Sequence, residues 1–129
     1  MMTKPKADLE TCREAVAEFW RRTAKNDTDL LLDHFEPDAV SHDPVGEPPI
    51  TTVEAHRALF DEVGGMFKEI TFETENVYES APKIGVRWHA TGTLQDGTVS
   101  KFGGLDVFEI SPAGKIAIHW GFWNPDGVE

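Results

Sequence analysis

The sequence predicts an α+β protein, with helices in its first half and an antiparallel sheet in its second half. Up to about residue 65, apolar side chains recur at three- and four-residue spacing, which is typical of amphipathic helices. From residue 70 onward the period is close to two, and β-branched and aromatic residues are frequent. Helices that precede a run of strands favour a helical layer packed on one face of a curved sheet.

Three helices are expected. The first covers residues 9–23. A second, short helix can be capped by Asp27 or Thr28, and Pro37 ends it. Thr51 is followed three residues later by a glutamate, which is the spacing of a capping box and opens the third helix.

Four strands are expected in the second half, and two turn signals predict how they pair. The strands cover residues 70–77, 84–94, 98–110 and 115–123. The Asp-Gly pair at 96–97 is a strong signal for a two-residue hairpin loop, and the Ala-Gly pair at 113–114 is a weaker one.

These loops predict a register, and with it the face on which each side chain lies. Arg87 is expected opposite Asp106, and Phe108 opposite His119. Since side chains alternate along a strand, one face then collects charged, histidine and aromatic residues. The members of this face are Arg87, His89, Thr91, Phe102, Asp106, Phe108, Ile110, His119 and Trp123. Such a mixture suits neither solvent nor a dry core, and it predicts a pocket lined by aromatic side chains with a few polar groups.

Length and composition limit the possible functions. The 129 residues, of which 40% are hydrophobic and 27% charged, fit a single domain over residues 1–129. The formal net charge of -11 disfavours nucleic acids and anionic membranes as partners. Apolar runs are too short for a transmembrane helix, and residues 1–10 lack a signal-peptide core, so the chain is expected to be cytoplasmic.

Asp106 is the most informative residue of the predicted pocket. Phe102 and Phe108 lie on its own face, so its carboxyl group is expected to be partly buried, where a bare carboxylate is costly. Burial could keep the group protonated, as a neutral hydrogen-bond donor, or Arg87 could hold it ionised. An ion pair between Arg87 and Asp106 that serves only the structure is the alternative without catalysis.

Asp43 stands at the end of a brief predicted strand, residues 39–43, directly before a loop rich in proline and glycine. Such an aspartate is often a turn-forming carboxylate. It could instead be a reactive acid at the mouth of the pocket, because two carboxylates in different surroundings are suited to acid/base chemistry. Sequence spacing alone does not bring Asp43 to Asp106.

His89 and His119 face the predicted pocket, where each could assist catalysis or be a satisfied core histidine. The histidines and carboxylates lack the spacing of a known metal-ligand motif, so no metal is expected. The sequence also lacks a phosphate-binding glycine loop, a nucleophile elbow and a reactive-cysteine setting. Among the tryptophans, Trp123 alone is placed to line the pocket.

Two segments carry a resemblance to a known family. The first is FEPDAVSHDPVGEPP, with its D-P-x-G loop, and the second is LDVFEISPAGKI with the closing HWGFWN. In these motifs, and over about residues 16–124, the chain resembles the NTF2-like (SnoaL-like) superfamily, closest to its ketosteroid isomerase branch.

The resemblance implies a cone, in which N-terminal helices close a strongly curved, mainly antiparallel sheet around a pocket, usually in a homodimer. It implies that Asp43 is the general base that moves a proton next to a carbonyl group. It also implies that Asp106 is the protonated acid that hydrogen-bonds the developing enolate. Phe19, Phe35 and Phe60 stand where the family carries tyrosines, so the hydroxyl group of the oxyanion hole is missing.

The function expected from the sequence is an acid/base enzyme of the isomerase or cyclase type that needs no cofactor. Its substrate would be a mostly apolar carbonyl compound, such as a steroid- or polyketide-like ring. Asp43, Asp106 and His89 are predicted to be catalytic. The residues predicted to contact the substrate are Phe19, Phe60, Arg87, Phe102, Phe108, His119 and Trp123.

Two other functions stay open, together with a prediction about assembly. The chain could be a small-molecule-binding dimer without turnover, or it could activate water as epoxide hydrolases do, through Asp106 and His89. A homodimer is expected because the opposite face of the sheet is apolar. The residues predicted on that face are Ile84, Val86, Trp88, Ile118, Trp120 and Phe122.

Overall fold

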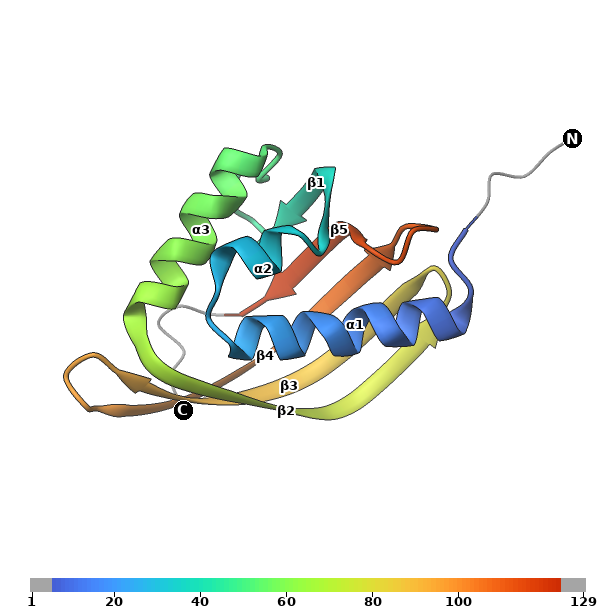
Figure 1. Cartoon of the computed structure of the whole chain (residues 1–129). Coiled ribbons are helices and arrows are strands. Elements are labelled where there is room, and N and C mark those ends of the chain that lie inside the picture. Colours follow the sequence, from blue (N-terminus) through green and yellow to red (C-terminus); the bar gives the residue numbers. More distant parts are fainter. Residues whose placement is uncertain (1–5, 124–129) are drawn as a thin grey trace, which may run out of the picture.

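The computed structural model describes residues 6–123, which form three helices and one sheet of five strands. The helices are α1 (Leu9–Ala24), α2 (Thr28–Leu32) and α3 (Val53–Met66). The strands are β1 (Phe35–His42), β2 (Phe67–Ser80), β3 (Lys83–Leu94), β4 (Val99–Ile110) and β5 (Ile116–Phe122). Figure 1 shows α1 lying along the concave face of the curved sheet. The predicted α+β fold, with helices packed on a mainly antiparallel sheet, is confirmed.

Each helix begins at a side chain that caps it. Asp8, Asp27 and Thr52 each accept a hydrogen bond from the backbone N–H three residues further on, which satisfies a donor that the helix itself leaves free. The cap of α3 is therefore Thr52, one residue after the predicted Thr51. Within residues 6–123, no helix is both long and apolar enough to cross a membrane.

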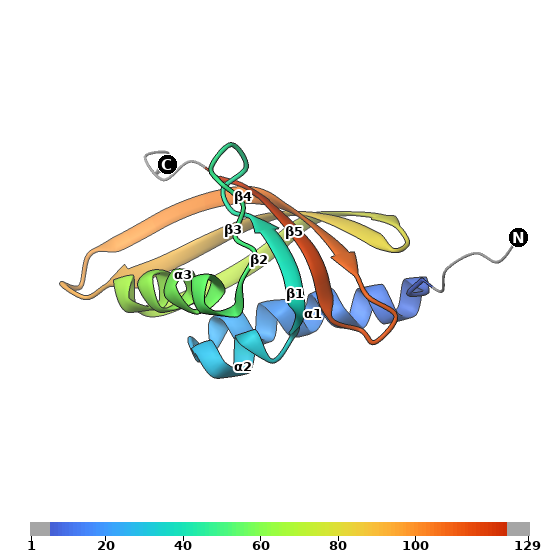
Figure 2. The same cartoon turned by 90° about the horizontal axis from the view of Figure 1, so that it is seen from above.

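The strand order is β1-β5-β4-β3-β2, and the described strands leave the sheet open. All neighbours are antiparallel except β1, which runs parallel to β5 at the edge of the sheet. This edge position tolerates Pro37, whose missing N–H would break a ladder inside the sheet. Helix α2 already ends at Leu32, and Pro37 lies within β1, so Pro37 does not end the helix as predicted. Figure 2 shows all three helices on the same side of the sheet.

The hairpin between β3 and β4 differs from the prediction by one residue. Leu94 and Thr98 close the loop, with the Leu94 N–H donating to the Thr98 carbonyl oxygen at 2.8 Å. The loop therefore contains three residues, 95–97, and Gly97 adopts a φ of 90°. This is the geometry of a three-residue hairpin loop, whose last residue must be left-handed.

The longer loop changes which residues of β3 face the helices. Asp106 lies opposite Val86, so the predicted pairing of Arg87 with Asp106 is wrong. A shift of one residue turns every side chain of a strand to the other face. The β3 residues now on the outer, convex face are Arg87, His89 and Thr91. Those now buried under the helices, instead of on the predicted dimer face, are Ile84, Val86 and Trp88.

The pairing of β4 with β5 confirms the predicted register at the level of the pocket. Phe108 lies opposite His119, and Asp106 lies opposite Gly121. These side chains share the concave face with the core. The buried cluster between α1 and the sheet includes Cys12, Val16, Phe19, Ile84, Val86, Phe108 and Ile110.

Candidate active site

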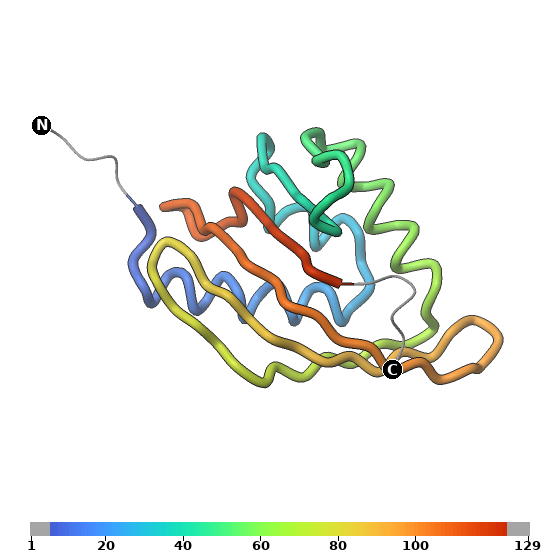
Figure 3. Tube along the Cα trace, turned by 180° about the vertical axis from the view of Figure 1, so that it is seen from behind, coloured from blue at the N-terminus to red at the C-terminus, as the bar shows by residue number. Residues whose placement is uncertain are grey.

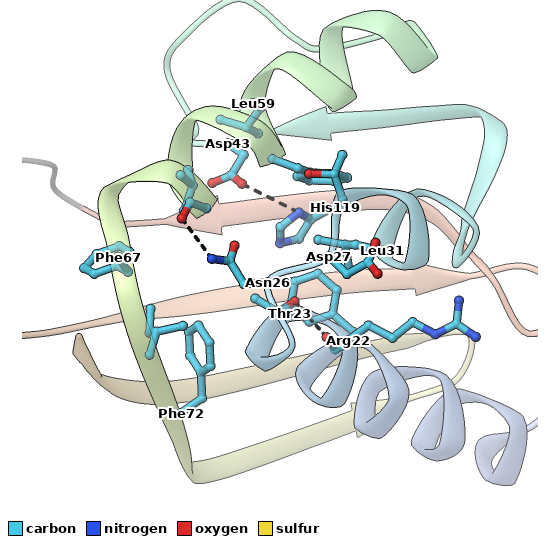
Figure 4. A pocket seen from close by; sticks show the side chains of 16 residues that line it. Arg22, Thr23, Asn26, Asp27, Leu31, Asp43, Leu59, Phe67, Phe72 and His119 are labelled. Atoms are coloured by element: carbon cyan, nitrogen blue, oxygen red, sulfur yellow. Dashed lines mark hydrogen bonds and ion pairs between the residues drawn. The ribbon is translucent and has the colours of Figure 1, made fainter. Parts of the chain in front are cut away.

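A pocket of about 120 Å³ lies between the three helices and the concave face of the sheet. Its apolar wall includes Phe19, Leu31, Leu59, Phe60 and Phe72. Its polar groups come from the last turn of α1, from the segment between α1 and α2, from the residue after β1 and from β5 (Figure 4). The pocket therefore joins an apolar wall to a few polar side chains, as small-molecule sites commonly do.

Asp43 reaches the pocket from the residue that follows β1. Its side chain is 18% exposed, and its Oδ1 accepts a hydrogen bond from the indole N–H of Trp123. Gly121 makes room for it, since a Cβ at that position would lie 2.5 Å from Asp43 Oδ1. The Val45 N–H donates to the Gly121 carbonyl oxygen at 2.8 Å and pins the loop to β5. Asp43 is therefore a pocket carboxylate as well as a loop residue.

His119 stands beside Asp43 in the pocket wall. Its Nδ1 lies 4.0 Å from Asp43 Oδ2, and Figure 4 shows the two side chains pointing toward each other. The ring stacks on Phe108 with a centroid distance of 4.9 Å and an interplanar angle of 6°, and Phe19 packs near it at 5.5 Å. The ring is thereby held with one nitrogen toward the pocket.

Asp106 lies behind His119 and does not line the pocket. Only 6% of the residue is exposed. Its Oδ2 is 2.9 Å from His119 Nε2, and its Oδ1 accepts from the indole N–H of Trp88 at 3.1 Å. Gly104 leaves space for that indole ring, because a Cβ there would lie 2.9 Å from Trp88 Cζ2. Both carboxylate oxygens are thus engaged by ring nitrogens, and Asp106 does not reach a substrate in the pocket.

The two carboxylates act on the charge of His119. Burial favours the neutral ring and lowers the pKa of His119, but the charge and hydrogen bond of Asp106, together with the charge of Asp43, outweigh it. The resulting pKa of His119 is raised above its ordinary value. In the imidazolium form, Nε2–H donates to Asp106 and Nδ1–H faces Asp43 and the pocket.

The other predicted site residues divide into three groups. Phe19 and Phe60 line the pocket, whereas Trp123, Phe102 and Phe108 do not, and Trp123 donates its indole N–H to Asp43 behind the pocket wall. Phe102 and Phe108 lie on the concave face, packed against Trp88 and His119 respectively. Arg87 and His89 lie on the convex face, where both contact Glu75. The register shift explains the last group, because it moves both residues away from Asp106.

Two contacts of the site were not predicted from the sequence: the hydrogen bond from Trp88 to Asp106 and the hydrogen bond between His56 and Ser41. His56 is buried; its Nε2 lies 2.8 Å from Ser41 Oγ and its Nδ1 lies 2.8 Å from the Thr52 carbonyl oxygen. Burial lowers the pKa of His56, and the neutral ring joins the start of α3 to β1 just before Asp43.

The turn between α1 and α2 supplies polar residues that the sequence did not single out. Asn26, with a φ of 57°, donates from Nδ2 to the Gly64 carbonyl oxygen at 2.9 Å, so this bond joins the turn after α1 to α3 (Figure 4). Among residues 6–123, no group of three or more histidine, cysteine or acidic side chains could hold a metal ion.

A family model described as a SnoaL-like domain matches residues 13–119, which is most of the chain. The chain belongs to the SnoaL-like family. This confirms the resemblance found in the sequence. No curated protein matches the sequence significantly.

Solved structures show the same fold in proteins of different activity. SalBIII, an epoxide hydrolase/cyclase-like enzyme of pyran ring formation in the polyether salinomycin, is 27% identical, with a TM-score of 0.83 over 94% of this chain and 96% of its own. The Delta 5-3-ketosteroid isomerase from Mycobacterium sp. is 23% identical, with a TM-score of 0.80 over 92% and 97%. RV0760c from Mycobacterium tuberculosis, solved with estradiol-17beta-hemisuccinate, is 23% identical, with a TM-score of 0.79 over 92% and 98%.

Proposed function

We propose that this SnoaL-like chain is an acid/base enzyme without a cofactor, which moves a proton at a carbon next to a carbonyl group of a mostly apolar substrate. Asp43 is the base, and His119 donates to the carbonyl oxygen. One observation carries the proposal. A carboxylate and a histidine with a raised pKa face the same apolar pocket, with Asp43 Oδ2 and His119 Nδ1 4.0 Å apart.

The chemistry needs a base at the C–H bond next to the carbonyl carbon and a hydrogen-bond donor at the carbonyl oxygen. Asp43 takes the proton from the carbon, the electron pair of that C–H bond forms the C=C bond of an enolate, and the π pair of the carbonyl group moves to the oxygen. His119 Nδ1–H hydrogen-bonds the oxygen as its charge develops, which is the role of an oxyanion-hole donor. Protonated Asp43 then returns the proton to carbon. Phe19, which has no hydroxyl group, cannot supply this donor.

Asp106 takes a different role in this proposal from the one implied by the family resemblance. It contacts His119 and not the pocket, so it acts as a positioning residue that keeps the imidazole charged and correctly turned. The buried contact with Trp88 holds Asp106 in place. The predicted catalytic role of His89 has no support, since His89 lies on the convex face.

Epoxide opening is the second candidate. The same pair of groups suits it, because Asp43 could deprotonate an attacking hydroxyl group while His119 protonates the epoxide oxygen as the C–O bond breaks. The 27% identity with SalBIII supports this alternative, which here relies on His119 in place of the predicted Asp106 and His89.

We also propose a homodimer formed through the convex face, which Figure 3 shows in front of the helices. After the register correction, the apolar residues of this face are on β4 and β5, where Leu105 is 38% and Phe122 is 46% exposed. Trp120, stacked on His42, lies beside them. Sedimentation of a monomer alone at micromolar concentration contradicts the dimer.

Deuterium exchange tests the proposed reaction. Small cyclic ketones in D₂O are followed by NMR with the wild type, Asp43→Asn and His119→Gln, and with Arg87→Ala as a matched control. Exchange at the carbon next to the carbonyl group is expected to fall by about 10²–10⁴-fold in Asp43→Asn and to be unchanged in Arg87→Ala. Opening of epoxide probes without ketone exchange favours the second candidate, and ligand binding without either reaction favours a binding protein.

A further inference from the structure

Five aromatic side chains form a cluster beside the pocket, over β2, β3 and β4. This aromatic plug consists of Trp20, Phe67, Phe72, Trp88 and Phe102. The ring centroids of Phe67 and Phe102 are 5.7 Å apart, those of Phe102 and Trp88 5.8 Å, and those of Trp88 and Trp20 5.8 Å. Phe72 packs on Trp20 at 5.1 Å and also lines the pocket. The plug therefore fills the space between α1 and the concave face of the sheet beside the pocket.

Contacts with the sheet hold the rings of the plug in place. The Trp88 indole N–H is bonded to buried Asp106, so the ring cannot swing away without breaking a charge-assisted hydrogen bond. Gly92 leaves the space that Phe67 fills, since a Cβ there would lie 2.4 Å from Phe67 Cε1. Closely packed rings with a fixed anchor move less easily than a single side chain at a pocket wall.

The remaining pocket measures about 120 Å³. Pockets for drug-sized ligands measure roughly 300–1,000 Å³. A buried cavity of about 150 Å³ holds one benzene molecule. The space beside Asp43 and His119 thus corresponds to one small ring. A four-ring molecule exceeds this volume, and Phe72 of the plug lines the pocket beside it.

The charges of the site restrict the substrate further. Asp43 and Asp27 line the pocket, Asp106 lies behind it, and His119 carries one positive charge when protonated. The cation Arg22 also lines the pocket, but its guanidinium group is already engaged by Glu18, with Nε 2.7 Å from Glu18 Oε1. An anionic group beside Asp43 would add repulsion in a chain that already carries a formal net charge of -11.

We infer that the pocket is selective for a neutral substrate whose reacting part is a single small ring, and that the aromatic plug excludes fused polycyclic compounds such as steroids. The carbonyl chemistry rests on the proposed function. The size limit does not, because it concerns binding.

Three phenols test the size limit, since they offer the same O–H group on one, two and four rings: phenol, 2-naphthol and estradiol. Binding is followed by NMR titration of the His119 ring and the Trp123 indole N–H, which report on the pocket. Phenol is expected to bind the wild type most tightly and estradiol about tenfold or more weakly, although estradiol has more apolar surface. Estradiol binding as tight as phenol overturns the inference, and so does the absence of phenol binding.

Variants of Phe72 connect the size limit to the plug. Phe72→Ala is expected to raise the affinity for 2-naphthol relative to phenol by about tenfold, because it removes the ring that separates the pocket from Trp20. Phe72→Val serves if the alanine variant unfolds. Tyr78→Ala, which truncates an exposed aromatic residue of the same strand, is expected to leave the order unchanged. An unchanged order in both folded Phe72 variants contradicts the role of the plug. The expected binding order without deuterium exchange would refute only the proposed reaction.

Discussion

The two hairpins of the sheet have loops of the same design but differ in how their strands continue. The loop between β3 and β4 covers residues 95–97, and the loop between β4 and β5 covers residues 112–114. Both contain three residues where the sequence predicted two, and both end in a glycine with positive φ, 90° at Gly97 and 82° at Gly114. In both hairpins the prediction from the glycine was therefore one residue too short for the loop.

A β-bulge corrects the error in one hairpin only. Next to the second loop, Ile110 pairs with Ile116 but Glu109 pairs with Ile118, so one extra residue on β5 restores the predicted alignment of Phe108 with His119. Between β3 and β4 the register runs without interruption from residue 83 to residue 93, and the shift persists. A glycine thus locates a turn, but loop length and bulges decide which side chains meet across it.

Asp106 belongs to both hairpins and shows the consequence. Across β5 it meets His119, as the sequence predicted for this face. Across β3 it meets Trp88 and not Arg87.

Removal of the Asp106 carboxylate is expected to destabilise the fold most. Asp106→Ala leaves the His119 ring and the Trp88 indole N–H buried without their acceptor, which costs about 3–5 kcal/mol of unfolding free energy. Asp43→Ala, which removes a more exposed carboxylate of the same pocket, is expected to cost about 1 kcal/mol. Urea denaturation of both variants measures the difference. Equal losses would show that Asp106 is not the central acceptor.

Stability is expected to fall with rising pH through His119. Its pKa is raised in the folded state, so its stabilising effect is complete below the ordinary value of 6.5 and is lost as the pH rises through the folded pKa. His34 and His56, whose pKa values burial lowers, act in the opposite sense and mainly below pH 6.5. Denaturant unfolding from pH 7 upward should therefore show a decline in the wild type that is absent in His119→Gln. Parallel curves would contradict the buried imidazolium.

The two packed tryptophans should respond differently to phenylalanine. Trp88→Phe leaves Asp106 Oδ1 without its donor and is expected to cost about 1–3 kcal/mol. The Trp20 Nε1 atom is buried without a hydrogen-bond partner among the described residues, so Trp20→Phe is expected to cost little. Thermal unfolding compares them, each variant being the control for the other. If Trp20→Phe lost more stability than Trp88→Phe, the hydrogen bond between Trp88 and Asp106 would not be the more important contact.

The fold and half of the site were predictable from the sequence because their signals are local. Helix caps, the change of hydrophobic period and the family motifs each depend on residues close together in the sequence. Only the motifs predicted that Asp43 and Asp106 belong to one site. The inward position of Trp88 was not predictable, because it depends on whether the loop before Thr98 has two or three residues. The transfer of the pocket-facing role from Asp106 to His119 depends on burial, which the strand pattern does not resolve.

Arg87→Ala should have the smallest effect and separates the predicted register from the observed one. Arg87 lies on the convex face, where Nε is 3.1 Å from Glu75 Oε2 and the side chain is 64% exposed. An exposed ion pair of this kind contributes less than about 1 kcal/mol and is screened by salt. The unfolding free energy should therefore change little, and the NMR titration of His119 should keep its midpoint. In the predicted register Arg87 would stand beside Asp106, and its removal would raise the pKa of His119 by removing a nearby positive charge. A shifted titration midpoint of His119 in Arg87→Ala would thus indicate that Arg87 lies on the concave face. It would contradict the observed register, in which Trp88 lies beside Asp106.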